Sequence, residues 1–329
     1  MINIRFYGEL KKYNNNIPFA SLKKEKKIMI SDIMNIFKRP LKECHLILLN
    51  GDSVYPAIEL NDNDFVSFFP KFKNIDISPI QILNLSGLID THSHLDEFEN
   101  ISETLKIAKE FGVDKIVGVG SDYNSNLKLI DLIKKDFPLK IFIALGIHPN
   151  NLNSDIEKGI EIIKENIDKI IGIGECGLDY KYKGFNKDLQ KDVFSRQIEI
   201  AREYKKPIIV HSRGAWEDCF DMLSSFDVEK ANFHWFSGDI DILKRIIDRG
   251  FFISATPALK FSKPHKDAIK FAPLERILVE TDSPVKYFER PSEPKDVIIT
   301  IKHLSILKDE PVDKVIEITN KNAKEFFGF

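Results

Sequence analysis

Two histidines stand two residues apart in the stretch LIDTHSHLD, residues 88–96, directly after a short apolar run. The apolar run predicts a β-strand, and side chains two apart on a strand face the same side. His92 and His94 would therefore point in one direction, where a single divalent cation could bind both imidazole rings. In a chain with eight histidines such a pair also arises by chance, so it needs further residues to indicate a metal site.

Other polar side chains follow apolar runs in the same way. Five more predicted strands end in a histidine or a carboxylate, at His148, Glu175, His211, His234 and Asp282. Imidazole nitrogens and carboxylate oxygens are ligands that zinc, manganese or magnesium accept, and this order of ligands is typical of a metal hydrolase. Arg213 follows two residues after His211, and its planar guanidinium suits a bidentate bond to a phosphate. The other histidines, His45, His265 and His303, are expected at the surface or in packing, and Asp90, Asp96 and Asp179 are expected in supporting or turn positions.

The strand ends belong to a regular alternation of strands and helices after residue 87. Amphipathic segments at 101–112, 188–206 and 239–250 predict helices between the strands. The apolar stretches that predict the eight strands are GLIDTH, KIVGVGS, KIFIALGIH, IIGIGECGLD, PIIVHSR, ANFHWFSG, FFISAT and ILVETDSP. Eight such repeats predict a (β/α)8 barrel of the TIM type, an α/β fold, in residues 81–329. The polar side chains would meet at its carboxyl-terminal end, where barrels of this type carry their chemistry.

Residues 1–80 predict a separate, small α+β unit. A strand over 2–10, a helix over 29–39 and strands within 44–54 and 61–70 follow one another in the order of a β-grasp fold. This unit resembles sulfur-carrier proteins and, more closely, a ubiquitin-like module that precedes some prokaryotic RNase domains. Sulfur carriers need a free C-terminal Gly-Gly, whereas here the chain continues through KFKNIDISPIQIL without one. We therefore expect a docking or structural module, with a protein partner.

The composition excludes several classes of protein. The net charge of −2 divides into +3 over the first 80 residues and −5 over the rest, which does not resemble a globally basic nucleic-acid binder. No apolar run approaches the roughly 20 residues that cross a bilayer, and the N-terminus lacks the apolar core of a signal peptide. The three cysteines have neither disulfide nor zinc-knuckle spacing. We expect a cytoplasmic protein without a membrane partner.

Residues 87–329 resemble the TatD family of metal-dependent deoxyribonucleases, in the amidohydrolase superfamily. The stretches that carry the resemblance are DTHSHLD, GIHP, IGECGLDY, IVHSR, HWFSG, ETDSP and TNKNAKEFFG. The resemblance implies two divalent metal ions, zinc, manganese or magnesium. It implies that the first ion is bound by His92, His94, Glu175 and Asp282. The second would be bound by Glu175, His211 and His234, so that Glu175 bridges the two together with a water or hydroxide.

Glu175 also separates this chain from relatives on the same barrel. Phosphotriesterase-like and dihydroorotase-like enzymes bridge their metals with a carboxylated lysine, and the strand IIGIGECGLD offers a glutamate and no lysine. Two loops depart from the family pattern. SATPALKFSKPH follows the seventh strand where the family usually has SFSG…TFK, and VKYFERPSEP follows ETDSP where it tends to have Tyr-Leu and Arg-Gly. Both loops would border the substrate groove.

The activity implied by the resemblance is hydrolysis of DNA phosphodiester bonds by a metal-activated hydroxide, with 3′–5′ exonuclease action on single-stranded ends. Glu175 and Asp282 would be the catalytic residues, and Asp282 would accept the proton of the nucleophile. His148 and Arg213 would bind the phosphate of the substrate. Aromatic residues after the ligand-bearing strands would stack on bases or pack over the barrel mouth: Tyr180, Tyr182, Trp235 and Phe236.

Several alternatives stay open at this point. His148 could order its own loop, and Arg213 could pair with a neighbouring acid such as Glu217. The barrel could instead be an amidohydrolase acting on a small amide, lactone or phosphoester. It could also be a non-catalytic scaffold that the β-grasp module recruits to a complex.

Overall fold

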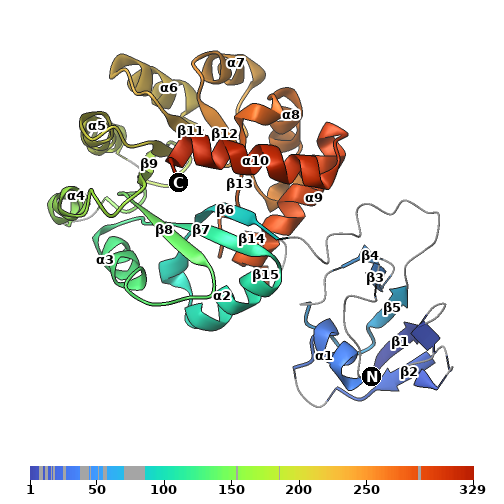
Figure 1. Cartoon of the computed structure of the whole chain (residues 1–329). Helices are drawn as coiled ribbons and strands as arrows, with labels where there is room; N and C mark the ends of the chain where they lie inside the picture. The colour runs from blue at the N-terminus through green and yellow to red at the C-terminus, as the bar shows by residue number, and fades with distance from the viewer. Residues whose placement is uncertain are drawn as a thin grey trace. The chain divides into compact units, whose positions relative to one another are not determined.

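The chain forms two compact units, Met1–Leu85 and Ser86–Phe329 (Figure 1). The computed structural model describes residues 1–6, 10–11, 14–15, 17, 19–24, 27–37, 44, 46–50, 52–54, 58–69, 86–152, 155–184, 186–287 and 290–329. The domain boundary predicted between residues 80 and 81, like His45, lies outside these described residues. Among the described residues, no helix combines the length and the apolar character needed to span a bilayer.

The first unit is a mixed sheet that packs against the helix α1 (Ile30–Ile36). The order of its strands is β2-β1-β5-β3-β4, in which β1 and β5 run parallel and the other pairs antiparallel. Alternate side chains of β1 are buried, as the period of a strand requires, and join Ile30 and Ile33 of the helix in one apolar core. The strands are β1 Ile2–Phe6, β2 Phe19–Leu22, β3 Leu46–Leu49, β4 Asp52–Ser53 and β5 Phe65–Phe69.

The second unit is a nearly closed barrel of eight parallel strands, which pair in chain order from β6 to β13. All eight strands predicted from apolar stretches are present, so the predicted α/β barrel is confirmed. The strands are β6 Leu88–Ser93, β7 Val113–Val119, β8 Lys140–Leu145, β9 Gly172–Asp179, β10 Ile208–Arg213, β11 Ala231–Phe233, β12 Phe252–Ala255 and β13 Ile277–Val279.

Helices surround the barrel (Figure 1). The three amphipathic segments singled out in the sequence form α2, α5 and α7, which bury one face each. The α-helices are α2 Ile101–Glu110, α3 Tyr123–Leu132, α4 Ile156–Glu165, α5 Lys187–Glu203, α6 Trp216–Ser225, α7 Ile240–Asp248, α8 Lys263–Phe271, α9 Val297–Lys308 and α10 Val312–Phe327. Short 3-10 helices are η4 Leu95–Glu97, η5 Pro257–Lys260, η6 Leu274–Arg276 and η7 Pro294–Asp296, and β14 Lys286–Tyr287 pairs with β15 Arg290–Pro291.

The last strand approaches the first through hydrogen bonds of the segment that follows β13. The backbone N–H of Asp282 donates to the carbonyl oxygen of His92 at 2.9 Å. The buried Asp90 carboxyl on β6 accepts from the N–H of Thr281 at 2.9 Å and from its hydroxyl at 2.6 Å. These bonds join the two ends of the chain of strands and hold Asp282 beside the histidines of β6.

Candidate metal centre

The first group of polar side chains lies at the end of β6. The Nε2 atoms of His92 and His94 are 3.4 Å apart. Each lies 3.5 Å from Oδ1 of Asp282, and they lie 3.4 and 3.3 Å from Oε2 of Glu175. Four side chains from three separate segments thus converge on one small volume, and three of them (His92, His94 and Asp282) offer ligand atoms that all lie within 4.8 Å of one another.

The second group surrounds the other oxygen of the same glutamate. Oε1 of Glu175 lies 2.8 Å from Nδ1 of His211 on β10 and 2.9 Å from Nε2 of His234, directly after β11. Nε2 of His148 lies 3.5 Å from the same oxygen. His148, Glu175 and His211 form a further group whose ligand atoms lie within 4.8 Å of one another. Glu175 therefore stands between two sets of imidazoles, with one oxygen toward each.

The position of the proton on the His94 ring indicates whether this arrangement suits a cation. Nδ1 of His94 lies 3.0 Å from the carbonyl oxygen of Val119, and a carbonyl can only accept, so the proton of the neutral ring is on Nδ1. The lone pair on Nε2 then faces two carboxylates, which is favourable only when a proton or a metal ion lies between them. Burial lowers the pKa of His94, but its hydrogen bonds to Asp282 and Glu175 raise the pKa well above the ordinary value. The donor set fits a metal ion, which would compete with that proton.

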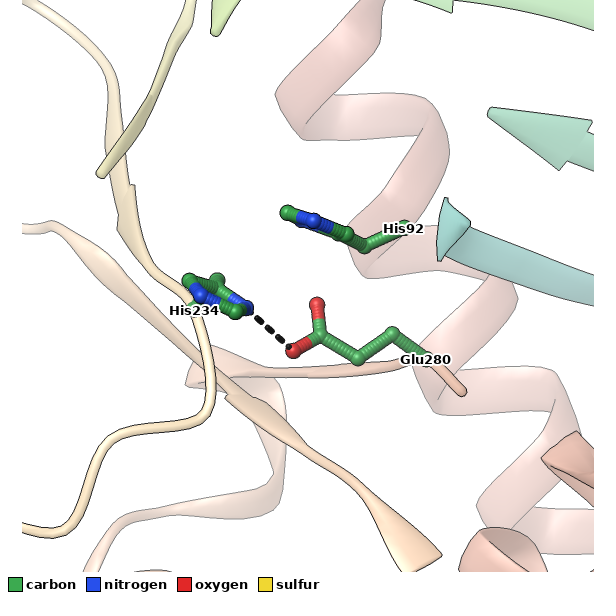
Figure 2. Close-up of side chains that lie close together, drawn as sticks. All are labelled: His92, His234 and Glu280. Carbon is green, nitrogen blue, oxygen red and sulfur yellow. Dashed lines mark hydrogen bonds and ion pairs between the residues drawn. The ribbon is translucent and has the colours of Figure 1, made fainter. Parts of the chain in front are cut away.

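Carboxylates stand behind two of the other imidazoles. Oδ2 of Asp179 lies 3.2 Å from Nε2 of His211, and Oε1 of Glu280 lies 3.2 Å from Nδ1 of His234 (Figure 2). Such partners fix which ring nitrogen carries the proton and which faces a metal. Asp179 had been expected in a supporting or turn role, whereas Glu280 had no predicted role. One signal in the sequence could have identified Glu280. It directly follows an apolar strand and stands two residues before Asp282, and a carboxylate buried at such a place needs a partner.

Backbone conformation brings these side chains together. Gly177 has φ +140°, and a Cβ at this position would lie 2.0 Å from the carbonyl oxygen of His211, so only glycine lets β9 approach β10 here. Asp282 and Trp235 adopt positive φ of 52° and 40° although neither is glycine. Conformations of this kind cost free energy and occur where the surrounding structure enforces them, often at functional sites.

The two predicted phosphate-binding residues differ in their surroundings. Nδ1 of His148 accepts from the N–H of Asn150 at 3.1 Å, and burial lowers the pKa of His148 to about 3, so the neutral ring carries its proton on Nε2, toward the pocket. Arg213 does form an ion pair, but with Asp179 and not with Glu217. Its Nε donates to Oδ1 at 3.0 Å, and one terminal nitrogen lies 3.0 Å from Oδ2. The Arg213 side chain is 56% exposed, which leaves N–H groups open to the pocket.

A cavity of about 550 Å³ opens over the site. Its lining includes His94, His148, Glu175, His211, Arg213, Trp216, His234, Trp235 and Asp282. Trp216 also lines a second cavity of about 600 Å³, together with Tyr180 and Lys187. Both cavities therefore border the Trp216 side chain, beyond the carboxyl-terminal ends of β9 and β10.

The family model described as TatD related DNase matches residues 89–328, almost the whole second unit. The chain belongs to the TatD family. An uncharacterized metal-dependent hydrolase from Methanocaldococcus jannaschii is 33% identical over 249 residues, which cover 73% of this chain and 96% of that protein. The human deoxyribonuclease TATDN3 is 29% identical over 260 residues, or 73% of this chain and 94% of the relative.

Solved structures agree with this assignment. The TatD homologue YjjV from Escherichia coli K12 superposes with a TM-score of 0.67 at 27% sequence identity, covering 74% of this chain and 98% of that one. A TatD family hydrolase from Entamoeba histolytica has the same fold, with a TM-score of 0.67 at 22% identity. The protein is thus a metal-dependent hydrolase of the TatD family, with clusters of histidine and carboxylate side chains able to bind metal.

Proposed function

We propose that this TatD protein binds two divalent cations and hydrolyses phosphodiester bonds of DNA, as a 3′–5′ exonuclease on single-stranded ends. The observation that carries the proposal is the position of Glu175, whose two oxygens face two separate groups of imidazoles. Two cations, one beside each oxygen, would engage both groups. The name of the human relative, a deoxyribonuclease, supports DNA as the substrate.

The proposed ligands divide between the two oxygens of Glu175. The first cation is bound by His92, His94, Glu175 and Asp282, and the second by Glu175, His211 and His234. Mixed imidazole and carboxylate donors suit zinc or manganese better than magnesium, which prefers an all-oxygen shell. Two divalent cations bound there would lower the pKa of a water molecule and offset the charge of a phosphodiester.

The protein's own side chains handle the proton and the phosphate. Asp282 accepts the proton of the attacking water on its carboxylate, which already faces the imidazoles of β6. The Nε2–H of His148 and the free N–H groups of Arg213 donate to non-bridging phosphate oxygens. Because Asp179 holds Arg213 through two contacts, the guanidinium is ordered before the substrate binds.

Aromatic rings near the cavity favour a nucleic-acid strand as the substrate rather than a small metabolite. Trp235 lies 5.3 Å from Tyr287, and Phe261 lies 6.3 Å from the same tyrosine, measured between ring centroids. Phe261 and Tyr287 come from the two loops that depart from the family pattern, so these loops meet beside the metal site. Tyr287 is buried and packs against its neighbours, whereas Trp216 and Trp235 line the cavity over the site. Stacking on such cavity-lining rings holds unpaired bases without strong sequence preference. Trp216, which lines both cavities, gives a further surface for an adjacent nucleotide.

We also propose that residues 1–80 form a ubiquitin-like β-grasp module that docks to a protein partner, and that residues 81–329 are the catalytic domain. The strand order β2-β1-β5-β3-β4, with parallel central strands and one helix packed on the sheet, supports the β-grasp assignment. We propose a cytoplasmic location because Cys44, Cys176 and Cys219 are free thiols, as is usual in a reducing compartment.

The test compares substrates in one assay. Purified protein, first freed of metal, is loaded with Mn²⁺, Zn²⁺ or Mg²⁺ and incubated with end-labelled single- and double-stranded oligonucleotides, and in parallel with small esters, lactones and amides. We expect metal-dependent shortening of single strands from the 3′ end. Turnover of only the small substrates would assign the protein to small-molecule hydrolysis. A chain that retains no metal and cleaves nothing would be a scaffold.

A further inference from the structure

Glu280 directly follows β13, and its side chain is fully buried beneath the candidate metal centre. Its Oε1 atom accepts a hydrogen bond from the backbone N–H of Trp235 at 3.0 Å and lies 3.2 Å from Nδ1 of His234. Nε2 of the same His234 ring faces Glu175 at 2.9 Å. One edge of this imidazole therefore points to Glu280 and the other to the centre of the site.

The second oxygen of Glu280 faces the other ring in Figure 2, that of His92. Within the part of the chain that the structure describes, this Oε2 atom has no hydrogen-bond partner, and neither has Nδ1 of His92. Both atoms are buried, and His92, His234 and Glu280 each offer an atom within 4.8 Å of the other two. Each atom, left unpaired, would cost about 1–3 kcal/mol. A hydrogen bond from Nδ1–H of His92 to Oε2 of Glu280 would remove both costs.

The two rings are placed so that one carboxylate can serve both. His92 and His234 stack with centroids 4.3 Å apart and planes 17° from parallel. Nε2 of each ring faces Glu175, at 3.4 Å for His92 and at 2.9 Å for His234. Their Nδ1 edges therefore lie on the side away from Glu175, where Glu280 stands. The N–H of Trp235, which donates to the same carboxylate, favours an acceptor role for Glu280 over direct binding of a cation.

We propose that Glu280 is a positioning residue that accepts a hydrogen bond from Nδ1–H of both His92 and His234, and so couples the two cation sites. The coupling rests on the ligand assignment proposed above, in which His92 belongs to the first site and His234 to the second. With both protons held on Nδ1, both Nε2 lone pairs are available to metal. Removal of this one carboxylate should therefore weaken both sites together.

The test measures metal binding and ring protonation instead of activity. Zn²⁺ is titrated calorimetrically into the metal-free full-length protein, with Glu280→Gln compared to wild type. In Glu280→Gln an NH2 group replaces one acceptor oxygen and the negative charge is lost, so one ring loses its acceptor and the other keeps only a weaker, neutral one. We expect both affinities to fall about 10- to 100-fold, the usual effect of losing a partner of a metal-binding histidine. Unchanged affinities, or a loss confined to one site, would overturn the proposal.

Asp296→Asn is the matched control. Asp296 carries another buried carboxyl of the barrel unit, and its Oδ2 atom accepts from the backbone N–H of Glu293 at 3.0 Å. We expect this variant to retain both affinities. A loss in Asp296→Asn equal to that in Glu280→Gln would show that any buried carboxyl of this unit acts through the fold, and would overturn the specific role of Glu280.

A second measurement does not depend on whether a variant folds. Long-range ¹H–¹⁵N spectra of the zinc-loaded wild type, labelled at histidine ring nitrogens, report which nitrogen is protonated. We expect His92 and His234 to carry the proton on Nδ1, and a bare Nδ1 on either ring would overturn the proposal. The proposed function fails separately, because absence of DNA cleavage with two intact, coupled sites would contradict only the activity.

Discussion

Nε2 of His234 lies 2.9 Å from Oε1 of Glu175. The two residues come from different strands of the barrel, and the other oxygen of Glu175 lies 3.3 Å from Nε2 of His94. One carboxylate therefore joins groups that the sequence separates by more than a hundred residues. Its removal should affect both groups at once.

Glu175→Gln keeps the shape of the side chain and removes its charge. We expect loss of both cations and a fall in kcat/KM of at least about 100-fold, the size seen even for partners behind metal ligands. Metal content by mass spectrometry and oligonucleotide cleavage check this. Glu157→Gln, which alters an exposed ion pair with Arg196, is the control and should match wild type. A Glu175→Gln enzyme near the wild-type rate would refute the bridging role.

Arg213→Ala should separate phosphate binding from metal binding. We expect unchanged metal content and a KM for oligonucleotides raised about 10-fold or more, since a charge-assisted hydrogen bond contributes about 1.5–3 kcal/mol. The KM of Arg213→Lys should lie between those of the wild type and Arg213→Ala, because an ammonium keeps the charge without the bidentate fork. If KM stays the same in both variants, the guanidinium serves only its pair with Asp179.

His148→Asn isolates one nitrogen of the imidazole. The amide oxygen can still accept from the N–H of Asn150, whereas the donor at Nε2 is lost. We expect a KM raised by about 5- to 10-fold, the value of one neutral hydrogen bond, with both cations retained. Steady-state kinetics beside metal analysis measure this. Loss of metal in His148→Asn would instead make His148 a ligand.

His265 predicts a pH dependence of stability that is independent of metal. Its Nδ1 donates to the carbonyl oxygen of Phe236 at 2.7 Å, and its Nε2 accepts from the N–H of Thr256 at 3.1 Å. Burial lowers the pKa of His265 from the ordinary 6.5 to about 4. Between these values the unfolded chain binds a proton that the folded protein does not, so stability falls as the pH falls from about 6.5 to 4.

The lowering of the His265 pKa corresponds to about 3 kcal/mol of unfolding free energy. We expect the wild type to lose about that much more unfolding free energy than His265→Asn between pH 7 and pH 4. Urea unfolding in the presence of EDTA measures the difference, because chelation removes the metal contribution. Parallel losses in the two proteins would contradict the lowered pKa of His265.

The positions of strands were predictable because apolar runs bounded by polar or glycine residues are unambiguous in a parallel barrel. The strand ends then indicated which side chains would meet, and His92, Glu175 and Asp282 do lie together. Nothing in a local pattern fixes partners across the barrel, however. The sequence suggested Glu217, four residues away, as an ion-pair partner of Arg213, whereas the partner in the structure is Asp179 on the neighbouring strand β9.

Glu280 had no predicted role, and for His265, expected at the surface or in packing, no local pattern indicated its hydrogen-bond partners. His265 lies on α8, where no strand end marks it, yet it is fully buried and joins two loops. Glu280 stands in the stretch ETDSP, of which only Asp282 was predicted to bind metal. The requirement that a buried polar group be paired identifies both residues, but burial is known only from the fold.

The central claim is that two cations share Glu175, and anomalous diffraction at the zinc edge tests it most directly. Crystals of the full chain grown with Zn²⁺ should show two strong anomalous peaks, one beside His92, His94 and Asp282 and the other beside His211 and His234, with the Glu175 carboxylate in contact with both. A single peak, or a pair of peaks away from Glu175, would contradict it.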